Sequence, residues 1–296
     1  MTKFNTDYYK GSDLYSDGDV ENTILDIVKN NTDFTDILHA TDNWAIFYHL
    51  TPVRKNLLDW YDFEKDATLL EIGGGCGAFS GMFAKKLKHV TVVELSKRRA
   101  EIIYNRHKDY NNLEIIAGNL NDVVFEEKFD YVTLIGVLEY AGRFTDGDTP
   151  FKTFLENAKS YLKPNGKLLL AIENKFGMKY WAGAREDHTG RLFDSIENYP
   201  NDKGIQTFGK AELIELLQSA GYKDTNFYYP MPDYKLPKII YSDEYLPKID
   251  DLFDIYSPNF DQDRYALFNE RDAFKNIIKN KQFDFFANSF LVEVSV

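Results

Sequence analysis

The sequence predicts an α/β fold built around a doubly wound, mostly parallel sheet of seven strands. Short apolar runs alternate with stripes of helical spacing along much of the chain, as they do in successive strand–helix–strand units. A glycine-rich turn separates the first apolar run from the helix after it. In doubly wound sheets a ligand binds beside such a turn, at the carboxyl ends of the strands.

An N-terminal arm and a helical cap are predicted over residues 1–65. Residues 1–21 are polar and contain several Asp and Gly, which is typical of a loose arm. Apolar side chains then recur at helical spacing over 22–61, and a further helix is expected to begin near Pro52, because proline is tolerated in a first turn.

The main domain is predicted over residues 66–296. Its parallel strands are expected at 68–72, 90–94, 113–117, 129–135 and 167–173, the last after a turn at 163–166. Helices are expected at 78–87, 151–162 and 210–219, and Ser96 is expected to cap another. Two more strands, 226–229 and 289–294, flank an insertion of about 230–285. The chain ends on a predicted strand, so a continuation past Val296 stays open.

Composition narrows the class of protein. The formal net charge of the 296 residues is -12, which disfavours nucleic acid and anionic lipid as partners. Cys76 is the single cysteine, so no internal disulfide is expected, as in a reducing compartment. The sequence shows neither a signal peptide nor an apolar run of membrane-spanning length. A cytoplasmic protein without a membrane span is therefore predicted, and its oligomeric state is not.

The most informative segment is the turn after the first strand. Gly73, Gly75 and Gly77 stand at alternate positions, and glycine allows the backbone to approach a ligand closely. The helix that follows offers unpaired backbone N–H groups. Since position 78 is Ala78, the spacing also fits the GxGxxA pattern of dinucleotide-binding proteins. The glycines alone therefore leave a dinucleotide open.

Three neighbouring positions favour S-adenosylmethionine (SAM) over a nicotinamide dinucleotide. Glu71 precedes the first glycine by two residues, where a carboxylate suits a cationic sulfonium and repels a pyrophosphate. Glu94 ends the second strand, where it can accept hydrogen bonds from two ribose hydroxyls. Asn119, which follows the third strand, can accept from an adenine amino group, and Leu120 comes next to it.

Together these positions resemble the class I SAM-dependent methyltransferase family over about residues 66–175, which implies a Rossmann-like fold and S-adenosylhomocysteine as product. In that family position 119 is more often Asp. The segment 136–140 resembles the motif that runs beside the methionine moiety, although Glu139 equally suits a helix-end role. The expected cofactor-binding residues are Glu71, Gly73, Gly75, Gly77, Glu94, Asn119, Leu120 and Gly136.

Polar and aromatic residues after the fifth strand are the candidates for handling the substrate. His188 is the expected base, because the ordinary pKa of histidine is about 6.5. Glu173 could be its partner in space, and His49 could be a second base or part of a lid over SAM. The expected substrate-binding residues are Tyr180, Trp181, Arg185 and Arg191. A purely structural role fits His188 and His49 equally well. No metal site is predicted, since His and acidic residues lack ligand spacing.

Segments 173–191 and 48–54 resemble methyltransferase domains encoded with bacterial surface-polysaccharide enzymes. This resemblance implies O-methylation of a saccharide or a cell-surface glycan intermediate. Three alternatives stay open: N-methylation of a small molecule or a protein, a SAM-binding module without turnover, and a nicotinamide-dependent oxidoreductase, against which Glu71 argues.

Overall fold

The computed structural model describes residues 1–296 except 12, 14–15, 203, 252–254 and 258–261. The chain divides into two compact units. Unit 1 consists of residues 1–134 and 161–166, and unit 2 consists of residues 135–160 and 167–296. Each unit contains part of the predicted site, and each is described in turn.

Unit 1 contains a parallel sheet. Its strands are β1 (Lys3–Asn5), β2 (Thr68–Ile72), β3 (His89–Glu94), β4 (Leu113–Ala117) and β5 (Phe129–Ile135), in the order β1-β4-β3-β2-β5. The chain moves from β2 to β3 and β4 on one side and returns to β5 on the other. The winding direction thus reverses at β2, and doubly wound sheets bind their ligands beside such a reversal.

Helices connect and flank these strands. The connections contain α4 (Ser80–Lys86), α5 (Lys97–Arg106) and the short 3-10 helix η2 (Leu120–Asp122). The predicted Ser96 cap is confirmed, because its hydroxyl accepts a hydrogen bond from the Arg99 N–H at 3.2 Å. The N-terminal helices are α1 (Val20–Asn30), α2 (Thr35–Ala40), α3 (Trp44–Leu50) and η1 (Pro52–Leu57).

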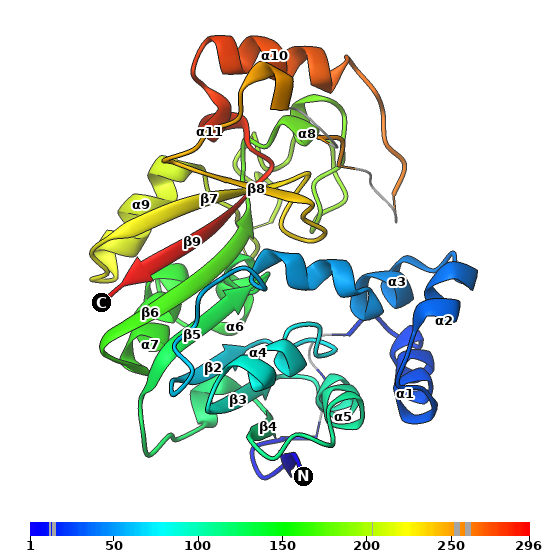
Figure 1. Ribbon diagram of the computed structural model, residues 1–296. Coiled ribbons are helices and arrows are strands. Elements are labelled where there is room, and N and C mark those ends of the chain that lie inside the picture. Colours follow the sequence, from blue (N-terminus) through cyan, green and yellow to red (C-terminus); the bar gives the residue numbers. More distant parts are fainter. Residues whose placement is uncertain (12, 14–15, 203, 252–254, 258–261) are drawn as a thin grey trace. The chain divides into compact units, whose positions relative to one another are not determined.

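The N-terminal helices form one group within unit 1, in which α1 packs on α5 and α2 lies beside α3 (Figure 1). Apolar side chains of α1 and of its neighbours close this interface: Ile24, Leu25, Val28, Leu50, Cys76 and Ile102. Burial of apolar area against the domain therefore holds the predicted helical cap in place.

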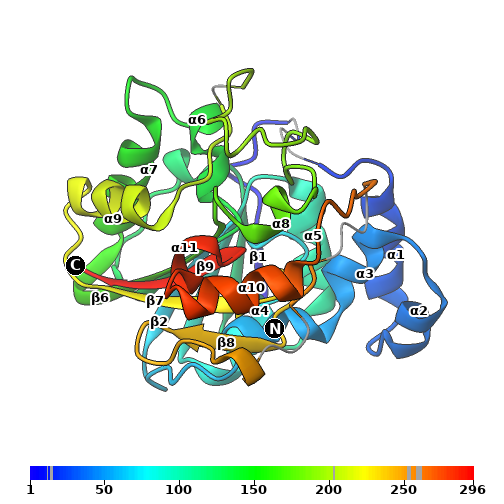
Figure 2. The ribbon, with the colours of Figure 1, turned by 90° about the horizontal axis from the view of Figure 1, so that it is seen from above.

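Unit 2 contains an antiparallel sheet in the order β6-β9-β7-β8. The strands are β6 (Leu162–Glu173), β7 (Thr225–Met231), β8 (Ile239–Ser242) and β9 (Ser289–Ser295). Its helices are η3 (Leu138–Tyr140), α6 (Ala141–Phe144), α7 (Pro150–Ser160), α8 (Met178–Trp181), α9 (Lys210–Ser219), η4 (Ile249–Asp251), α10 (Glu270–Lys279) and α11 (Phe283–Phe286). Aromatic contacts of Phe283 with Tyr229, Tyr241 and Phe274 join α11 to β7, β8 and α10, and Figure 2 shows α10 beside α11.

The predicted α/β character with a mostly parallel sheet is confirmed, but the prediction of seven strands is wrong. The described residues contain nine, because β1 arises in the expected loose arm and β8 in the expected insertion. β1 has only three residues, too few to show a periodicity. It is held by pairing with β4 and by the stacking of Phe4 on Tyr104, at 5.4 Å between ring centroids.

The bounds predicted for 113–117, 129–135 and 210–219 are confirmed. The turn predicted at 163–166 is wrong, because β6 begins at Leu162 and continues through this segment. Lys163, which contacts Asp130 at 2.7 Å, ties the start of that strand to β5 within unit 1. No helix in the described ranges has the length and apolar character needed to cross a membrane.

Candidate active site

The glycine turn after β2 has the backbone conformation that its sequence demands. Gly73, Gly75 and Gly77 have φ values of 71°, 53° and 74°, in the left-handed region that favours glycine. The Gly73 N–H donates to the Val93 carbonyl at 2.8 Å, which ties the turn to β3. Apart from its chain neighbours, a Cβ added at Gly75 would have no heavy atom within 4 Å. This open approach suits close contact of a ligand with the backbone.

Glu94 is joined to the same turn. One of its carboxylate oxygens accepts from the Gly75 N–H at 2.7 Å and the other from the Ser96 N–H at 3.0 Å. Burial raises the pKa of Glu94, while the nearby Arg99 charge opposes the rise. A carboxylate has about four lone-pair sites, so each oxygen can still accept a further hydrogen bond. The geometry thus fits a carboxylate that holds both the turn and a pair of ribose hydroxyls.

Glu71 is buried more deeply than its predicted role requires. Its side chain is 3% exposed and accepts a hydrogen bond from the Ser80 hydroxyl at 2.6 Å. Burial raises the pKa of Glu71 to about 8, against the opposing effects of Ser80 and Arg54. Without a ligand, the neutral form is therefore favoured at pH 7. The expected attraction between its charge and a sulfonium requires that a bound cation restore the ionised form.

The remaining predicted cofactor residues differ in what they contact. The Asn119 side chain accepts from the Asn121 N–H at 3.0 Å and caps η2, so part of its capacity is used in the loop. Leu120 is buried in unit 1. Gly136 belongs to unit 2, has a φ of 68°, and would place an added Cβ 2.8 Å from the Tyr234 hydroxyl. Glycine is therefore required at position 136 by packing alone.

His49 belongs to a buried charge network in unit 1. Its Nε2 lies 2.8 Å from Asp17, which also contacts Arg99 at 2.8 Å, and Arg99 in turn contacts Glu21 at 2.7 Å. Burial lowers the pKa of His49 to about 4 despite the Asp17 carboxylate. These contacts support a structural role that joins α3, α5 and α1.

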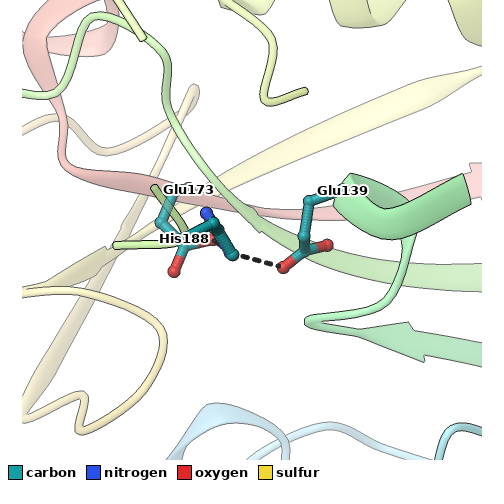
Figure 3. Close-up of side chains that lie close together, drawn as sticks. All are labelled: Glu139, Glu173 and His188. Atoms are coloured by element: carbon teal, nitrogen blue, oxygen red, sulfur yellow. Dashed lines mark ion pairs between the residues drawn. The ribbon is translucent and has the colours of Figure 1, made fainter. Parts of the chain in front are cut away.

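Unit 2 brings together three side chains that are distant in sequence. Glu139 comes from η3, Glu173 from the end of β6, and His188 from the loop after α8. His188 Nε2 lies 3.6 Å from Glu139 Oε1 and 3.7 Å from Glu173 Oε2. Figure 3 shows the three side chains pointing toward one another. The sequence predicted His188 beside Glu173, and Glu139 joins them.

The His188 ring is held from its other side. Its Nδ1 lies 2.8 Å from Glu186 Oε1, and Glu186 Oε2 accepts from the backbone N–H groups of His188 and Thr189, each at 2.7 Å. The Tyr199 hydroxyl also donates to Glu186, at 3.0 Å. Glu186 is fully buried, so this short loop closes around one carboxylate.

The electrostatic setting of His188 departs from the one that the sequence suggested. Burial alone lowers its pKa, but the surrounding carboxylates, Glu173 first, outweigh burial and raise the pKa well above the usual range. Burial and the Glu173 charge raise the pKa of Glu139. His188 therefore holds its proton at neutral pH, and the ordinary pKa near 6.5 no longer supports its assignment as the base.

Two lysines complete the cluster. Lys235 contacts Glu173 Oε1 at 2.5 Å and Asp187 at 2.7 Å. Lys179 contacts Asp187 at 2.7 Å, and the Tyr180 hydroxyl donates to the same carboxylate at 2.5 Å. Although burial acts against it, the two lysines hold the pKa of Asp187 well below its usual range. Asp187 therefore shares Lys235 with Glu173.

The predicted substrate-binding residues do not form one surface. Tyr180 is fully buried, which supports packing and leaves no ring face for stacking. Trp181 is 38% exposed, with its ring 6.4 Å from that of Phe286. Arg185 donates to the Gly190 carbonyl within its own loop, and Arg191 lies 3.6 Å from Asp194. Of the four, Trp181 is the residue with an exposed aromatic ring.

Sequence reasoning missed several residues of these networks. Arg54, whose guanidinium lies 4.0 Å from the centre of the Tyr48 ring, affects the Glu71 carboxylate and lies in the segment 48–54 that the sequence singled out. Lys179 lies within the polar stretch after β6, so its position in the sequence could have identified it as a candidate site residue. Lys235 gives no such signal, since it lies in the segment expected to be an insertion.

The comparisons with known proteins agree with this fold. A family model described as a methyltransferase domain matches residues 45–226. Anthranilate N-methyltransferase of Ruta graveolens is 28% identical over 205 residues, which cover 69% of this chain and 52% of that protein. Ribosomal RNA small subunit methyltransferase A of Syntrophus aciditrophicus is 27% identical over 84 residues, 28% of each chain. The chain thus spans about a quarter to a half of the length of these curated relatives.

A solved structure supports the fold independently. Phosphoethanolamine N-methyltransferase 1 of Haemonchus contortus, in complex with phosphoethanolamine and S-adenosylhomocysteine, is similar with a TM-score of 0.51 and 14% identity. The match covers 94% of this chain and 48% of that chain. The family match confirms the predictions of a methyltransferase domain and of SAM as its cofactor. The chain belongs to the family of SAM-dependent methyltransferase domains.

Proposed function

We propose that the protein transfers a methyl group from SAM to a hydroxyl oxygen of a saccharide or cell-surface glycan intermediate. The observation that carries this proposal is the buried cluster of Glu139, Glu173 and His188. Both carboxylate oxygens of Glu139 and Oε2 of Glu173 lack a hydrogen-bond partner, whereas Oε1 of Glu173 contacts Lys235. A hydroxyl acceptor must lose its proton as it is methylated, and an unbonded carboxylate can accept that proton.

Separate groups of residues would handle the cofactor and the acceptor. When bound, SAM would supply the methyl group for transfer to the acceptor oxygen and would leave as S-adenosylhomocysteine. In unit 1, the Gly73–Gly77 turn, Glu94 and Asn119 bind the cofactor. In unit 2, Glu139 or Glu173 accepts the hydroxyl proton, and protonated His188 holds the two carboxylates toward each other.

The acceptor class is supported by the segments that resemble methyltransferases of surface-polysaccharide systems. Trp181, part of the first of these segments, is partly exposed and offers an aromatic face to a sugar ring. A second candidate is a small-molecule amine. The relative from Ruta graveolens is named as an N-methyltransferase, and carboxylates of this cluster also suit an ammonium group. The expected absence of a nucleic acid partner stays a prediction, because the relative from Syntrophus aciditrophicus is a ribosomal RNA methyltransferase.

The test is product analysis with isotopically labelled SAM. The full chain is incubated with nucleotide sugars, free glycans, small amines and ribosomal RNA, and the labelled products are identified by mass spectrometry and NMR. An O-methylated saccharide supports the proposal, whereas a labelled amine or RNA replaces it with another acceptor. If S-adenosylhomocysteine binds but no acceptor from a cell extract is labelled, the chain is a SAM-binding module without turnover.

Matched variants test the residue roles. Glu139→Gln and Glu173→Gln each remove a proton acceptor and keep the side-chain volume, and the expected loss of kcat is about 10²- to 10⁴-fold. The control is Glu215→Gln, which changes an exposed carboxylate on α9. Unchanged turnover in both cluster variants would remove the proposed role of these glutamates while leaving cofactor binding intact.

A further inference from the structure

We propose that Glu139, Glu173 and His188 form a binding site for a first-row divalent metal cation. One ligand atom from each residue, two carboxylate oxygens and an imidazole nitrogen, lies within 4.8 Å of the other two. The site would use only unit 2, so it goes beyond the proposed methyl transfer and does not require the cofactor.

The spacing of the atoms fits a shared cation better than mutual hydrogen bonds. At 3.6 and 3.7 Å, His188 Nε2 is too far from either carboxylate for a hydrogen bond. Ligands bound to one metal at about 2.0–2.2 Å lie about 3.0–3.4 Å from one another in octahedral or tetrahedral geometry. The two distances from His188 exceed that spacing by a few tenths of an ångström, and the two carboxylate oxygens lie within 4.8 Å of each other.

Burial supplies an independent reason. Glu139 is 1% exposed and Glu173 is fully buried, yet both oxygens of Glu139 and Oε2 of Glu173 lack a hydrogen-bond partner. A buried carboxylate without such partners costs several kcal/mol unless a positive charge compensates it. Lys235 compensates Glu173 through Oε1. The opposite oxygen, Oε2, is the one that faces His188.

His188 is oriented as a metal ligand requires. Glu186 Oε1 lies 2.8 Å from Nδ1, so a proton on Nδ1 is donated to this carboxylate. A cation bound at Nε2 would replace the second proton, which His188 holds in the metal-free protein. A carboxylate that accepts from the outer nitrogen of a ligating histidine is the usual support in metal sites. Glu186 is itself held by backbone N–H groups and by Tyr199.

The donor set indicates the class of ion. Two carboxylates and a neutral imidazole carry a charge of about -2, which matches a divalent cation. Imidazole favours Zn²⁺, Fe²⁺ and similar ions over Mg²⁺ and Ca²⁺, while carboxylates also suit Mn²⁺. Three protein ligands leave coordination positions open, and neighbouring hydroxyl oxygens of an acceptor are suitable ligands for them.

The test is a titration of the chelator-treated full chain with Mn²⁺, followed by electron paramagnetic resonance and without SAM. We expect saturable loss of the free-ion signal with one strong site per chain. We also expect a nitrogen coupling in the spin-echo spectrum, which reports imidazole coordination. Titration with Zn²⁺ should displace the bound Mn²⁺.

Variants locate the site. Glu139→Gln, Glu173→Gln and His188→Gln should each weaken Mn²⁺ binding by more than 100-fold. Glu186→Gln, which changes the support and no ligand, should weaken it by about 10- to 100-fold. Glu215→Gln and His39→Gln change exposed residues and should leave the affinity unchanged. Thermal unfolding of each variant identifies any that fails to fold.

The proposal is overturned if wild-type protein shows no saturable site, or if binding survives in the folded Glu139→Gln and His188→Gln variants. The first result would mean that a proton on His188 alone holds the two carboxylates together. Binding of S-adenosylhomocysteine, measured separately by calorimetry, reports on unit 1. A failed metal site is therefore distinguishable from a failed methyltransferase assignment.

Discussion

Replacement of Gly75 by leucine separates cofactor binding from folding. The surroundings of an added Cβ are open, so the only expected structural cost is the left-handed backbone at φ of 53°. That conformation costs a non-glycine residue roughly 1–2 kcal/mol, which lowers the melting temperature by several degrees at most. The leucine side chain would enter the approach to the backbone that the cofactor is proposed to use.

Isothermal titration with S-adenosylhomocysteine measures the effect. We expect Gly75→Leu to weaken binding by at least 100-fold, about 2.8 kcal/mol, and NAD to bind neither protein. Gly147→Leu is the matched control, because Gly147 also has a positive φ and open surroundings but lies in an exposed loop of unit 2. Gly74→Ala is the contrasting variant, since its Cβ would lie 2.4 Å from Val92 Cγ1 and should impair folding.

The result that refutes this reasoning is specific. If folded Gly75→Leu binds S-adenosylhomocysteine within threefold of the wild type, the turn is not the cofactor site. Equal loss of affinity in Gly147→Leu would instead show that any strained substitution disturbs binding. Either outcome would require a new assignment for Glu94 as well, because its carboxylate is hydrogen-bonded to Gly75.

Three further predictions concern buried charges. Burial raises the pKa of Glu71 from 4.5 to about 8, so the folded state retains a proton that the unfolded chain loses. The free energy of unfolding should therefore fall as the pH rises from about 4.5 to about 8. In urea titrations, Glu71→Gln should reduce the difference in the free energy of unfolding between pH 5 and pH 8. The same difference in the variant and the wild type would contradict this prediction. His49→Asn should lower the free energy of unfolding by about 1–3 kcal/mol with little change in kcat, since the His49 ring is hydrogen-bonded to Asp17. A large loss of kcat without a loss of stability would restore His49 as a catalytic candidate. Lys235→Met removes a positive charge beside Glu173 and Asp187 and should lower the free energy of unfolding in denaturant by about 3–5 kcal/mol. An unchanged free energy would show that other positive charges suffice to balance these carboxylates.

The sequence was sufficient for features that depend on neighbouring residues. The strands at 113–117 and 129–135 and the helix at 210–219 were predicted with the bounds that the structure has. Periodicity and turn residues within a few positions decide such elements. The glycine turn could also be predicted from the sequence, because its positive φ values favour glycine over other residues.

Tertiary structure decided the features that depend on distant residues. The strands β1 and β8 are short and acquire their identity only by pairing with β4 and β7. The raised pKa of Glu71 follows from burial, which its position two residues before a glycine does not reveal. In the same way, Glu139, Glu173 and His188 meet because η3, β6 and the loop after α8 converge in unit 2. Local pattern therefore determines which elements form, whereas burial and charge at the site arise from long-range packing, which local periodicity does not encode.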